Sequence, residues 1–341
     1  MHRRTFLAGA LAFAPGFAAL TQARAEPDPS ERLKRLLDEA EALTPLETVI
    51  VSRNGALLAE RGYRGRSTTA PTNIKSASKS VISALVGIAI DRGVLQGPDQ
   101  TIASILKADL PPDPDPRLLQ ITMGHCLSMQ TGLERTSGAN YGRWVASRNW
   151  VRAALAEEFE DEPGGRMLYS TGSTHLLSAA LTRAAKSPTL ALARDWLGPV
   201  PDFAIADWER DPQGVYLGGN QMAMSPRSLL AFGEIYRNGG RTPDGRQIVP
   251  EAWIARSWEP RTQSRFTGDA YGYGWFLRRM ADRDVRYAWG YGGQMLYIVP
   301  ALGLTVAMTS DEGQPSARTG YRDALHALLA AIIAAVPQPA E

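Results

Sequence analysis

The sequence predicts an α+β fold, in which helices flank an antiparallel sheet made from both chain ends and a helical region is inserted between those ends. Two observations predict it: β-prone segments lie near each end of the chain, and most segments between them show helical periodicity. With 341 residues, of which 44% are apolar and 21% charged, the chain is long enough to bury a large core. We expect one domain over residues 26–341, an α/β sandwich with a helical subregion over about 80–240.

The N-terminal end of this domain predicts a helix followed by a β-hairpin. Residues 30–43 place several leucines on one side of an amphipathic helix. Residues 47–53 are β-prone, and Asn54-Gly55 separates them from a second such run at 56–60. Asn-Gly between two β-prone runs is a strong hairpin signal, because both residues tolerate the positive φ of a tight turn.

The C-terminal end predicts a second pair of strands and a final helix. Strands are expected at 295–299 and 304–309, joined by a turn at 300–303, and the Ala/Leu/Ile-rich residues 318–335 are expected to form a helix. The segment 109–116 predicts a loop because it is rich in Pro and Asp. Helical periodicity in the middle of the chain predicts helices at 76–93, 118–130, 149–157, 174–185 and 226–237.

Residues 1–25 predict an export signal rather than part of the fold. Arg3 and Arg4 precede a short apolar run that ends at Ala23-Arg24-Ala25, which has the form of a signal-peptidase site. The arginine pair resembles a twin-arginine signal, which the twin-arginine translocon reads during export. We expect a bacterial periplasmic or secreted protein with no stable membrane insertion after cleavage. The alternative is an uncleaved anchor on the outer face of the membrane.

Charge and cysteine content argue against several classes of function. The 37 Lys and Arg nearly balance the 35 Asp and Glu, with no block of like charge, which argues against nucleic acid as a partner. Cys126 is the only cysteine, so no internal disulfide can form, and its apolar neighbours predict a buried thiol. Four scattered histidines and one cysteine show no zinc-binding spacing, so we expect no metal and no other cofactor.

Two segments fit the pattern Ser-x-x-Lys, and their surroundings distinguish them. After Ser76 and Lys79 the chain is apolar nearly all round through residue 90, the pattern of a buried helix. Burial favours a neutral amine, and a neutral amine one helical turn from a hydroxyl can take its proton. After Ser104 and Lys107 the chain meets a Pro-rich loop, so Lys107 is expected on the surface. Ser76 is therefore the candidate nucleophile and Lys79 its candidate base.

Three ordered motifs resemble the serine β-lactamase and penicillin-binding-protein superfamily, in its class C and esterase branch. The first is Ile74-Lys75-Ser76-Ala77-Ser78-Lys79-Ser80, which looks like the active-serine motif. The second is residues 121–133, which resemble the helix that follows the active-serine helix in that branch. The third is Gly164-Gly165-Arg166-Met167-Leu168-Tyr169-Ser170-Thr171-Gly172, which resembles the tyrosine motif, with Thr171 where Asn is usual. The resemblance extends from about residue 30 to 335 and implies a β-lactamase/transpeptidase-like fold.

In that tyrosine motif the hydroxyl lies near both the serine oxygen and the lysine nitrogen. The resemblance therefore implies that Tyr169 carries protons together with Lys79. A phenol near a cation loses its proton more readily, so we expect Tyr169 to act as a base and later as an acid.

A further motif of the superfamily, usually Lys-Thr-Gly or a variant with His, is missing. No lysine follows Lys186, and the stretch 288–300 instead resembles 6-aminohexanoate-oligomer hydrolases and esterases. Penicillins and peptidoglycan stem peptides carry a carboxylate that the missing cation helps to hold, a contact worth about 1.5–3 kcal/mol. The resemblance therefore favours small ester or amide substrates over antibiotics.

The same stretch supplies the expected oxyanion and substrate-binding residues. By alignment, the oxyanion donors are the amides of Ser76 and Met295, with Gln294, Gly293 and Gly292 beside them. The aromatic candidates for the pocket include Tyr141, Trp289 and Tyr291.

The sequence thus predicts a serine hydrolase that cleaves an ester or amide bond through an acyl-enzyme, without a metal. Two alternatives stay open: a class C-type β-lactamase or DD-peptidase, and a catalytically inactive protein that binds peptidoglycan or a partner in the same cleft. The missing Lys-Thr-Gly argues against the first alternative, and intact Ser76, Lys79 and Tyr169 argue against the second.

Overall fold

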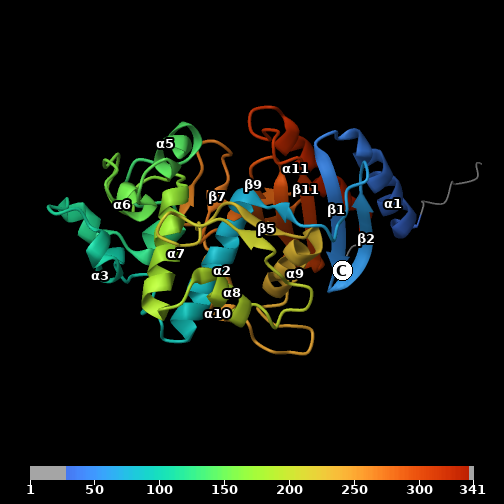
Figure 1. Ribbon diagram of the computed structural model, residues 1–341. Coiled ribbons are helices and arrows are strands. Elements are labelled where there is room, and N and C mark those ends of the chain that lie inside the picture. Colours follow the sequence, from blue (N-terminus) through green and yellow to red (C-terminus); the bar gives the residue numbers. More distant parts are fainter. Residues whose placement is uncertain (1–27, 338–341) are drawn as a thin grey trace, which may run out of the picture.

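A computed structural model describes residues 28–337, and an antiparallel sheet of eight strands forms one half of it (Figure 1). The strand order is β2-β1-β11-β10-β9-β8-β7-β6, so the N-terminal hairpin pairs with the last strand of the chain. This pairing confirms the expected sheet from both chain ends. The strands are β1 (Leu46–Arg53), β2 (Ala56–Gly62), β6 (Thr262–Gln263), β7 (Ala270–Tyr271), β8 (Phe276–Met280), β9 (Arg283–Gly290), β10 (Gln294–Val299) and β11 (Leu304–Ser310).

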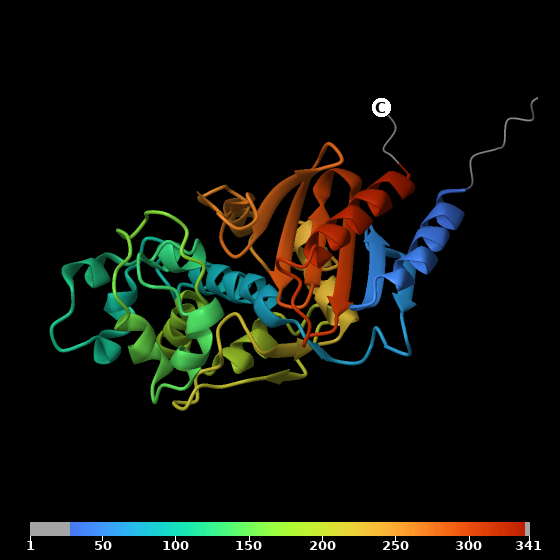
Figure 2. The ribbon, with the colours of Figure 1, turned by 90° about the horizontal axis from the view of Figure 1, so that it is seen from above.

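Helices cover both faces of this sheet. Helices α1 (Pro29–Glu39) and α11 (Tyr321–Ala335) lie side by side on one face, as Figure 2 shows, and α9 (Pro226–Arg237) packs on the other. The side chains of β10 alternate accordingly. Met295 and Tyr297 belong to the cluster under α11, whereas Leu296 and Ile298 belong to the cluster that contains α9.

The helical region is inserted between β2 and β6 and forms the other half of the molecule (Figure 1). Its helices are α2 (Ser78–Asp91), α3 (Ile102–Ile105), α4 (Met123–Leu127), α5 (Tyr141–Val145), α6 (Trp150–Leu155), α7 (Thr171–Ala185), α8 (Thr189–Trp196) and, after α9, α10 (Glu251–Ser257). A small sheet has the order β3 (Thr72–Asn73), β5 (Met222–Met224) and β4 (Asp207–Trp208). Short 3₁₀ turns occupy Ala40–Ala42, Lys75–Ala77, Lys107–Asp109, Pro116–Gln120, Gly138–Asn140 and Pro300–Leu302.

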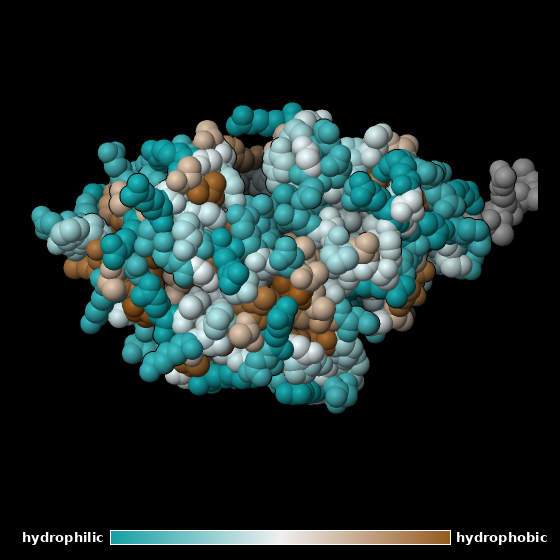
Figure 3. All heavy atoms as spheres, viewed as in Figure 1, coloured by the Kyte–Doolittle hydropathy of each residue, from teal (hydrophilic) through white to brown (hydrophobic). Residues whose placement is uncertain are grey.

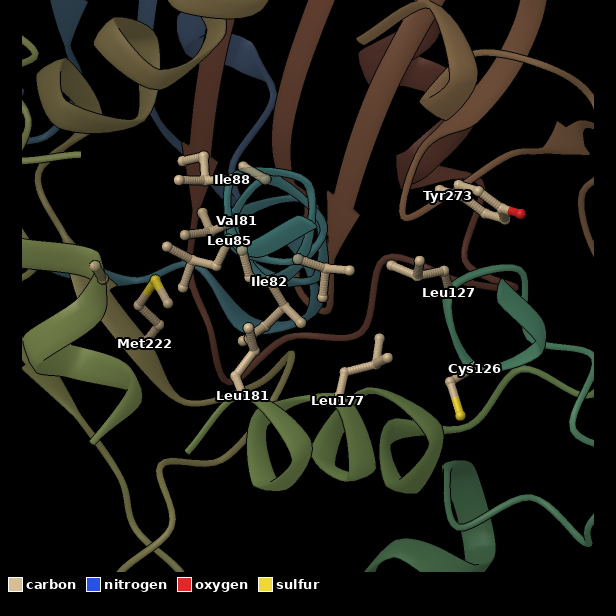
Figure 4. Close-up of a cluster of buried hydrophobic side chains, with 14 of the residues drawn as sticks. Val81, Ile82, Leu85, Ile88, Cys126, Leu127, Leu177, Leu181, Met222 and Tyr273 are labelled. Atoms are coloured by element: carbon tan, nitrogen blue, oxygen red, sulfur yellow. The ribbon is translucent and has the colours of Figure 1, made fainter. Parts of the chain in front are cut away.

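Helix α2 is the central helix of the core. Every residue from Ser78 to Ala89 is buried, as the apolar run after Ser76 predicts. Figure 4 shows Val81, Ile82, Leu85 and Ile88 of α2 among the buried side chains of neighbouring elements, including Leu177 and Leu181 of α7. A side chain at the start of α2 is therefore carried into a region that excludes water.

Two of the expected helices are divided in the structure. The expected helix 76–93 begins as the 3₁₀ turn Lys75–Ala77 before α2. The expected helix 118–130 is interrupted because Ile121 and Thr122 are extended, and Thr122 caps the short helix α4 by accepting a hydrogen bond from the amide of His125. The loop at 109–116 and the helix at 226–237 are confirmed.

The expected export signal, residues 1–25, lies outside the described residues. Within residues 28–337, no helix is long and apolar enough to cross a membrane. The face shown in Figure 3 is mostly hydrophilic, with apolar side chains in small scattered groups.

Candidate active site

Ser76 and Lys79 meet where the 3₁₀ turn passes into α2. The Nζ atom of Lys79 lies 3.0 Å from the Oγ atom of Ser76. Ser76 as a residue is half-buried. Nζ of Lys79 also donates hydrogen bonds to the carbonyl oxygen of Gly219 at 2.6 Å and to Oγ1 of Thr171 at 3.3 Å. The one-turn spacing thus brings amine and hydroxyl within hydrogen-bond distance, as the sequence predicts.

Near neutral pH the amine of Lys79 populates both its charged and its neutral form. The side chain is 2% exposed, and burial lowers its pKa to about 7. No carboxylate is among its hydrogen-bond or ion-pair partners, which within residues 28–337 are hydroxyl and carbonyl oxygens. Near neutral pH a large fraction of this amine is therefore unprotonated and can accept a proton from Ser76.

Tyr169 lies beside this pair, in the irregular segment before α7. Its ring centroid is 5.1 Å from Nζ of Lys79. The ring stacks on Phe276 of β8 at 6.2 Å between centroids. Burial raises the pKa of Tyr169, and its interaction with the Ser76 side chain offsets only part of that rise. The expected easy loss of the phenolic proton is therefore wrong: the resting phenol is protonated.

Two residues that contribute to this site, Gly219 and Ser137, lie outside the three motifs, whereas Thr171 belongs to the tyrosine motif. The carbonyl oxygen of Gly219 accepts the shortest hydrogen bond of Lys79. Two observations require glycine here: the φ of Gly219 is +78°, and an added Cβ would lie 2.4 Å from Cγ of Lys79. Thr171 reaches Lys79 although it is shorter than Asn, and Oγ of Ser137 lies 3.0 Å from its hydroxyl. Of the two residues outside the motifs, Gly219 carries a sequence signal, because the Gly218-Gly219 pair allows close backbone approach.

The expected oxyanion donor Met295 must be corrected. Met295 lies in β10, where it is paired with Trp289 of β9 on one side and Met308 of β11 on the other. A strand with neighbours on both sides uses its amides in the sheet, so this amide cannot point at a substrate.

The residues next to Met295 also have structural roles. Gln294 is fully buried, and its side-chain amide donates to the carbonyl oxygen of Ser310 at 2.7 Å and accepts from the amide of Ser310 at 3.2 Å. An added Cβ at Gly293 would meet the ring of Tyr321 at 2.8 Å, and one at Gly292 would meet the carbonyl oxygen of Asp311 at 2.7 Å. These three residues join the turn after β9 to β11 and α11.

The start of that turn, by contrast, lies against the nucleophile segment. An added Cβ at Gly290 would lie 2.2 Å from the carbonyl oxygen of Ile74, two residues before Ser76. Tyr291 follows Gly290 and is outside the β9–β10 ladder, which resumes at Gln294. The amide of Tyr291 is therefore better placed than that of Met295 to face the site.

The expected aromatic residues have different surroundings. The hydroxyl of Tyr141 accepts a hydrogen bond from Nδ2 of Asn220 at 3.0 Å, next to Gly219. The indole of Trp289 is half-buried and donates to Oγ of Ser316 at 3.2 Å. The side chain of Tyr291 is 51% exposed. Tyr141 and Tyr291 thus adjoin the site from its two sides, whereas Trp289 is mainly a packing residue.

The remaining candidates lie outside the site. Ser104 and Lys107 are exposed, as predicted, and Oγ of Ser104 donates to the carbonyl oxygen of Thr101. Cys126 is fully buried, and burial raises the pKa of its thiol. His125 belongs to the cap of α4. Among residues 28–337, no group of three or more His, Cys, Asp or Glu side chains forms a candidate metal site.

The sheet from both chain ends, the helices on its two faces and the inserted helical region define a fold of the β-lactamase and transpeptidase type. The chain belongs to the Beta-lactamase family, whose sequence model matches residues 40–331. Members of this family are mostly serine hydrolases. No curated protein sequence matches the chain.

Solved structures with the same fold differ widely in sequence from this chain. A protein proposed to be a 6-aminohexanoate-dimer hydrolase, from Bacillus anthracis, is 19% identical with a TM-score of 0.72, covering 90% of this chain and 83% of that one. EstCE1, a hydrolase with promiscuous acyltransferase activity, is 17% identical with a TM-score of 0.72 (90% and 98% covered). A penicillin-binding protein homologue from Caulobacter crescentus is 17% identical with a TM-score of 0.72 (91% and 98% covered). At these identities the likeness shows the fold alone.

Proposed function

We propose that this chain is an exported serine hydrolase that cleaves an ester or amide bond through an acyl-serine intermediate. The observation that carries the proposal is the 3.0 Å contact between Nζ of Lys79 and Oγ of Ser76 in a site where burial lowers the pKa of Lys79 to about 7. A hydroxyl becomes a useful nucleophile when a neutral base lies within hydrogen-bond reach.

The proposed acylation divides proton transfer between two residues. Lys79 takes the proton of Ser76 as Oγ attacks the substrate carbonyl, forming a tetrahedral intermediate. Tyr169, protonated at rest, donates its proton to the leaving oxygen or nitrogen as the carbon–heteroatom bond breaks, and Lys79 returns the proton to the phenolate. Water then attacks the acyl-serine ester and gives up a proton to Lys79 and Tyr169. The ester bond breaks, the acid leaves, and Oγ of Ser76 takes the proton back.

We propose the amides of Ser76 and Tyr291 as donors to the oxyanion of the intermediate. Ser76 lies at the start of a helix, where amides lack intrahelical acceptors, and Tyr291 follows the residue that packs against Ile74. Two backbone donors already held in position stabilise charge that develops only in the transition state.

A fluorophosphonate probe, with the adduct mapped by mass spectrometry, tests this function. We expect labelling at Ser76, no labelling of Ser76→Ala, and labelling at least about 100-fold slower in Lys79→Met. Ser104→Ala and Lys107→Met are matched controls that fit the same sequence pattern on the surface, and they should behave as wild type. Labelling at Ser104, or no labelling together with no ester hydrolysis, contradicts the proposal and favours an inactive binding protein.

The proposed export rests on residues 1–25 alone. Replacing Arg3 and Arg4 by lysine should retain the protein in the bacterial cytoplasm, because the twin-arginine pathway reads that pair. Cell fractionation measures the outcome, and N-terminal sequencing of the exported protein distinguishes cleavage after Ala25 from an uncleaved anchor. Unchanged export of the lysine variant would contradict the pathway.

A further inference from the structure

A buried histidine–carboxylate pair lies behind the lysine of the proposed site. His175 is on α7, one turn after Thr171, and Asp211 is in the loop between β4 and β5. The side chains of both are fully buried, and Nε2 of His175 lies 3.1 Å from Oδ2 of Asp211. The rings of Trp144 and Trp150 pack on His175, with centroids 5.6 Å and 5.8 Å away. None of its contacts is with Ser76 or Lys79, so it cannot be their base.

The hydrogen bonds of this pair determine which nitrogen of His175 carries the proton. The amide of Gly218 donates to Nδ1 of His175 at 3.4 Å, so Nδ1 is the acceptor and Nε2 carries the hydrogen given to Asp211. The other oxygen of Asp211 accepts from the amides of Gln213 and Val215, both at 2.8 Å. Burial opposes ionisation of Asp211, but the interaction with His175 and, after it, the two backbone bonds outweigh burial and lower the pKa of Asp211. The pair is therefore an ionised carboxylate bonded to Nε2 of an imidazole whose Nδ1 faces the amide of Gly218.

Through Gly218 the pair is connected to Lys79. The carbonyl oxygen of Gly218 accepts from Oγ1 of Thr174 at 2.9 Å, so neighbouring residues of α7 hold both the amide and the carbonyl of Gly218. The next carbonyl, that of Gly219, accepts the 2.6 Å bond from Nζ of Lys79. Added Cβ atoms at Gly218 and Gly219 would lie 2.0 Å from the carbonyl oxygen of Thr174 and 2.4 Å from Cγ of Lys79. This segment thus has no space to shift toward either neighbour.

We propose that His175 and Asp211 are a positioning pair, which holds the Gly218–Gly219 segment on α7 and thereby fixes the amine of Lys79 beside Ser76. The inference rests on the proposed function, because it assigns the pair a role in the proton transfer from Ser76. A histidine that only fills space would make neither of these two bonds, the one to the buried carboxylate of Asp211 and the one from the amide of Gly218. The pair acts through backbone atoms and touches no reacting group, so its effect should be on the rate of acylation rather than on substrate binding.

Two variants of His175 with side chains of nearly equal size separate positioning from packing. His175→Asn retains an acceptor near the place of Nδ1, whereas His175→Leu has none, and both lose the donor to Asp211. With a neutral nitrophenyl ester, we expect the Leu variant to lose at least about tenfold in kcat with KM within about twofold of wild type, and the Asn variant to keep kcat within about threefold. Fluorophosphonate labelling of Ser76 should slow in parallel.

Asp211→Asn is the complementary variant. An amide at this position can donate to Nε2 of His175, which moves the ring hydrogen to Nδ1 and turns the acceptor of the Gly218 amide into a second donor. We expect kcat to fall at least about tenfold again, and the acid limb of the pH profile of kcat/KM to move from its wild-type position. His125→Leu, in the cap of α4, is a control that loses a histidine elsewhere and should retain kcat.

All rates are measured well below the melting temperature of each variant and are referred to folded protein. Equal kcat values for the Asn and Leu variants of His175, or a wild-type kcat for Asp211→Asn, would overturn the positioning role. A wild-type protein in which Ser76 is not labelled would instead overturn the proposed function. The two failures are therefore distinguishable.

Discussion

At the residue scale, the protonation of Lys79 should control the rate. Since burial lowers its pKa to about 7, the amine is neutral above that pH and cationic below it. We expect kcat/KM for a neutral ester to be level above about pH 8 and to fall about tenfold per pH unit well below 7.

Lys79→Arg tests the same point, because a guanidinium stays protonated across this range and cannot act as the base. The variant should lose at least about 100-fold in kcat/KM at every pH, whereas Lys107→Arg should keep the wild-type profile. A profile without an acid limb near pH 7 would show that Lys79 is not the base.

Lys75, directly before the nucleophile, carries a charge that Glu312 neutralises. Its Nζ atom lies 2.9 Å from Oε2 of Glu312 and 3.2 Å from Oε1 of Gln221, and the Glu312 side chain is 50% exposed. In Glu312→Gln the ammonium group is left without its counter-ion next to Ser76. We expect kcat/KM for a monosuccinate nitrophenyl ester to rise about threefold relative to the neutral butyrate ester, a modest factor because water screens the charge.

The ratio of the two esters is the measurement, since a general loss of activity cancels in it. Glu162→Gln, which removes an exposed carboxylate elsewhere, is the control. If the ratio in Glu312→Gln equals that of wild type, the charge of Lys75 has no influence on the preference between the anionic and the neutral ester.

At the element scale, Gln294 at the end of the turn after β9 is expected to contribute to thermal stability but not to catalysis. Gln294 fastens β10 to β11 through two hydrogen bonds with the backbone of Ser310. Gln294→Ala removes both of these bonds from a fully buried position, at a cost of about 2 kcal/mol or more. We expect Tm to fall by about 4 °C or more, while kcat/KM of the folded protein stays within about twofold of wild type.

Thermal unfolding and ester hydrolysis on the same preparation test this prediction. A loss of tenfold or more in kcat/KM with an unchanged Tm would show that Gln294 is a substrate-binding residue after all.

The sequence predicts the elements that carry a local signal. Asn54-Gly55 marks the first hairpin, and an apolar run marks α2, so both are confirmed. The β8–β9 hairpin was missed because Ala281 and Asp282, with φ of 45° and 58°, form its turn without the usual Asn-Gly. The same limit applies to the site. Ser76 and Lys79 are one turn apart, whereas the contact of Gly219 with Lys79 joins residues 140 positions apart.

At the scale of the whole molecule, the site lies where the sheet meets the inserted helical region. Ser76 lies in the 3₁₀ turn between β3 and α2, and Lys79 lies in the first turn of α2. Tyr169 precedes α7, and Gly290 ends β9. Since β1 is held by β11, the sheet is complete only when both chain ends are folded. The proposed oxyanion donors therefore come from two segments that only the finished fold brings together.

The missing cation of the Lys-Thr-Gly motif predicts a preference for ester or amide hydrolysis over antibiotic hydrolysis. No lysine follows Lys186, and the position before the turn is occupied by Ala288, Trp289 and Gly290 on β9. A carboxylate-bearing substrate thus lacks a contact worth about 1.5–3 kcal/mol, or about 10- to 100-fold in kcat/KM. We expect short neutral nitrophenyl esters and linear amides to be better substrates than a chromogenic cephalosporin. Comparison of the three kcat/KM values, with Ser76→Ala as the blank, measures this preference. A cephalosporin that ranks first would mean that another cation holds the carboxylate and that the family's β-lactamase chemistry is retained.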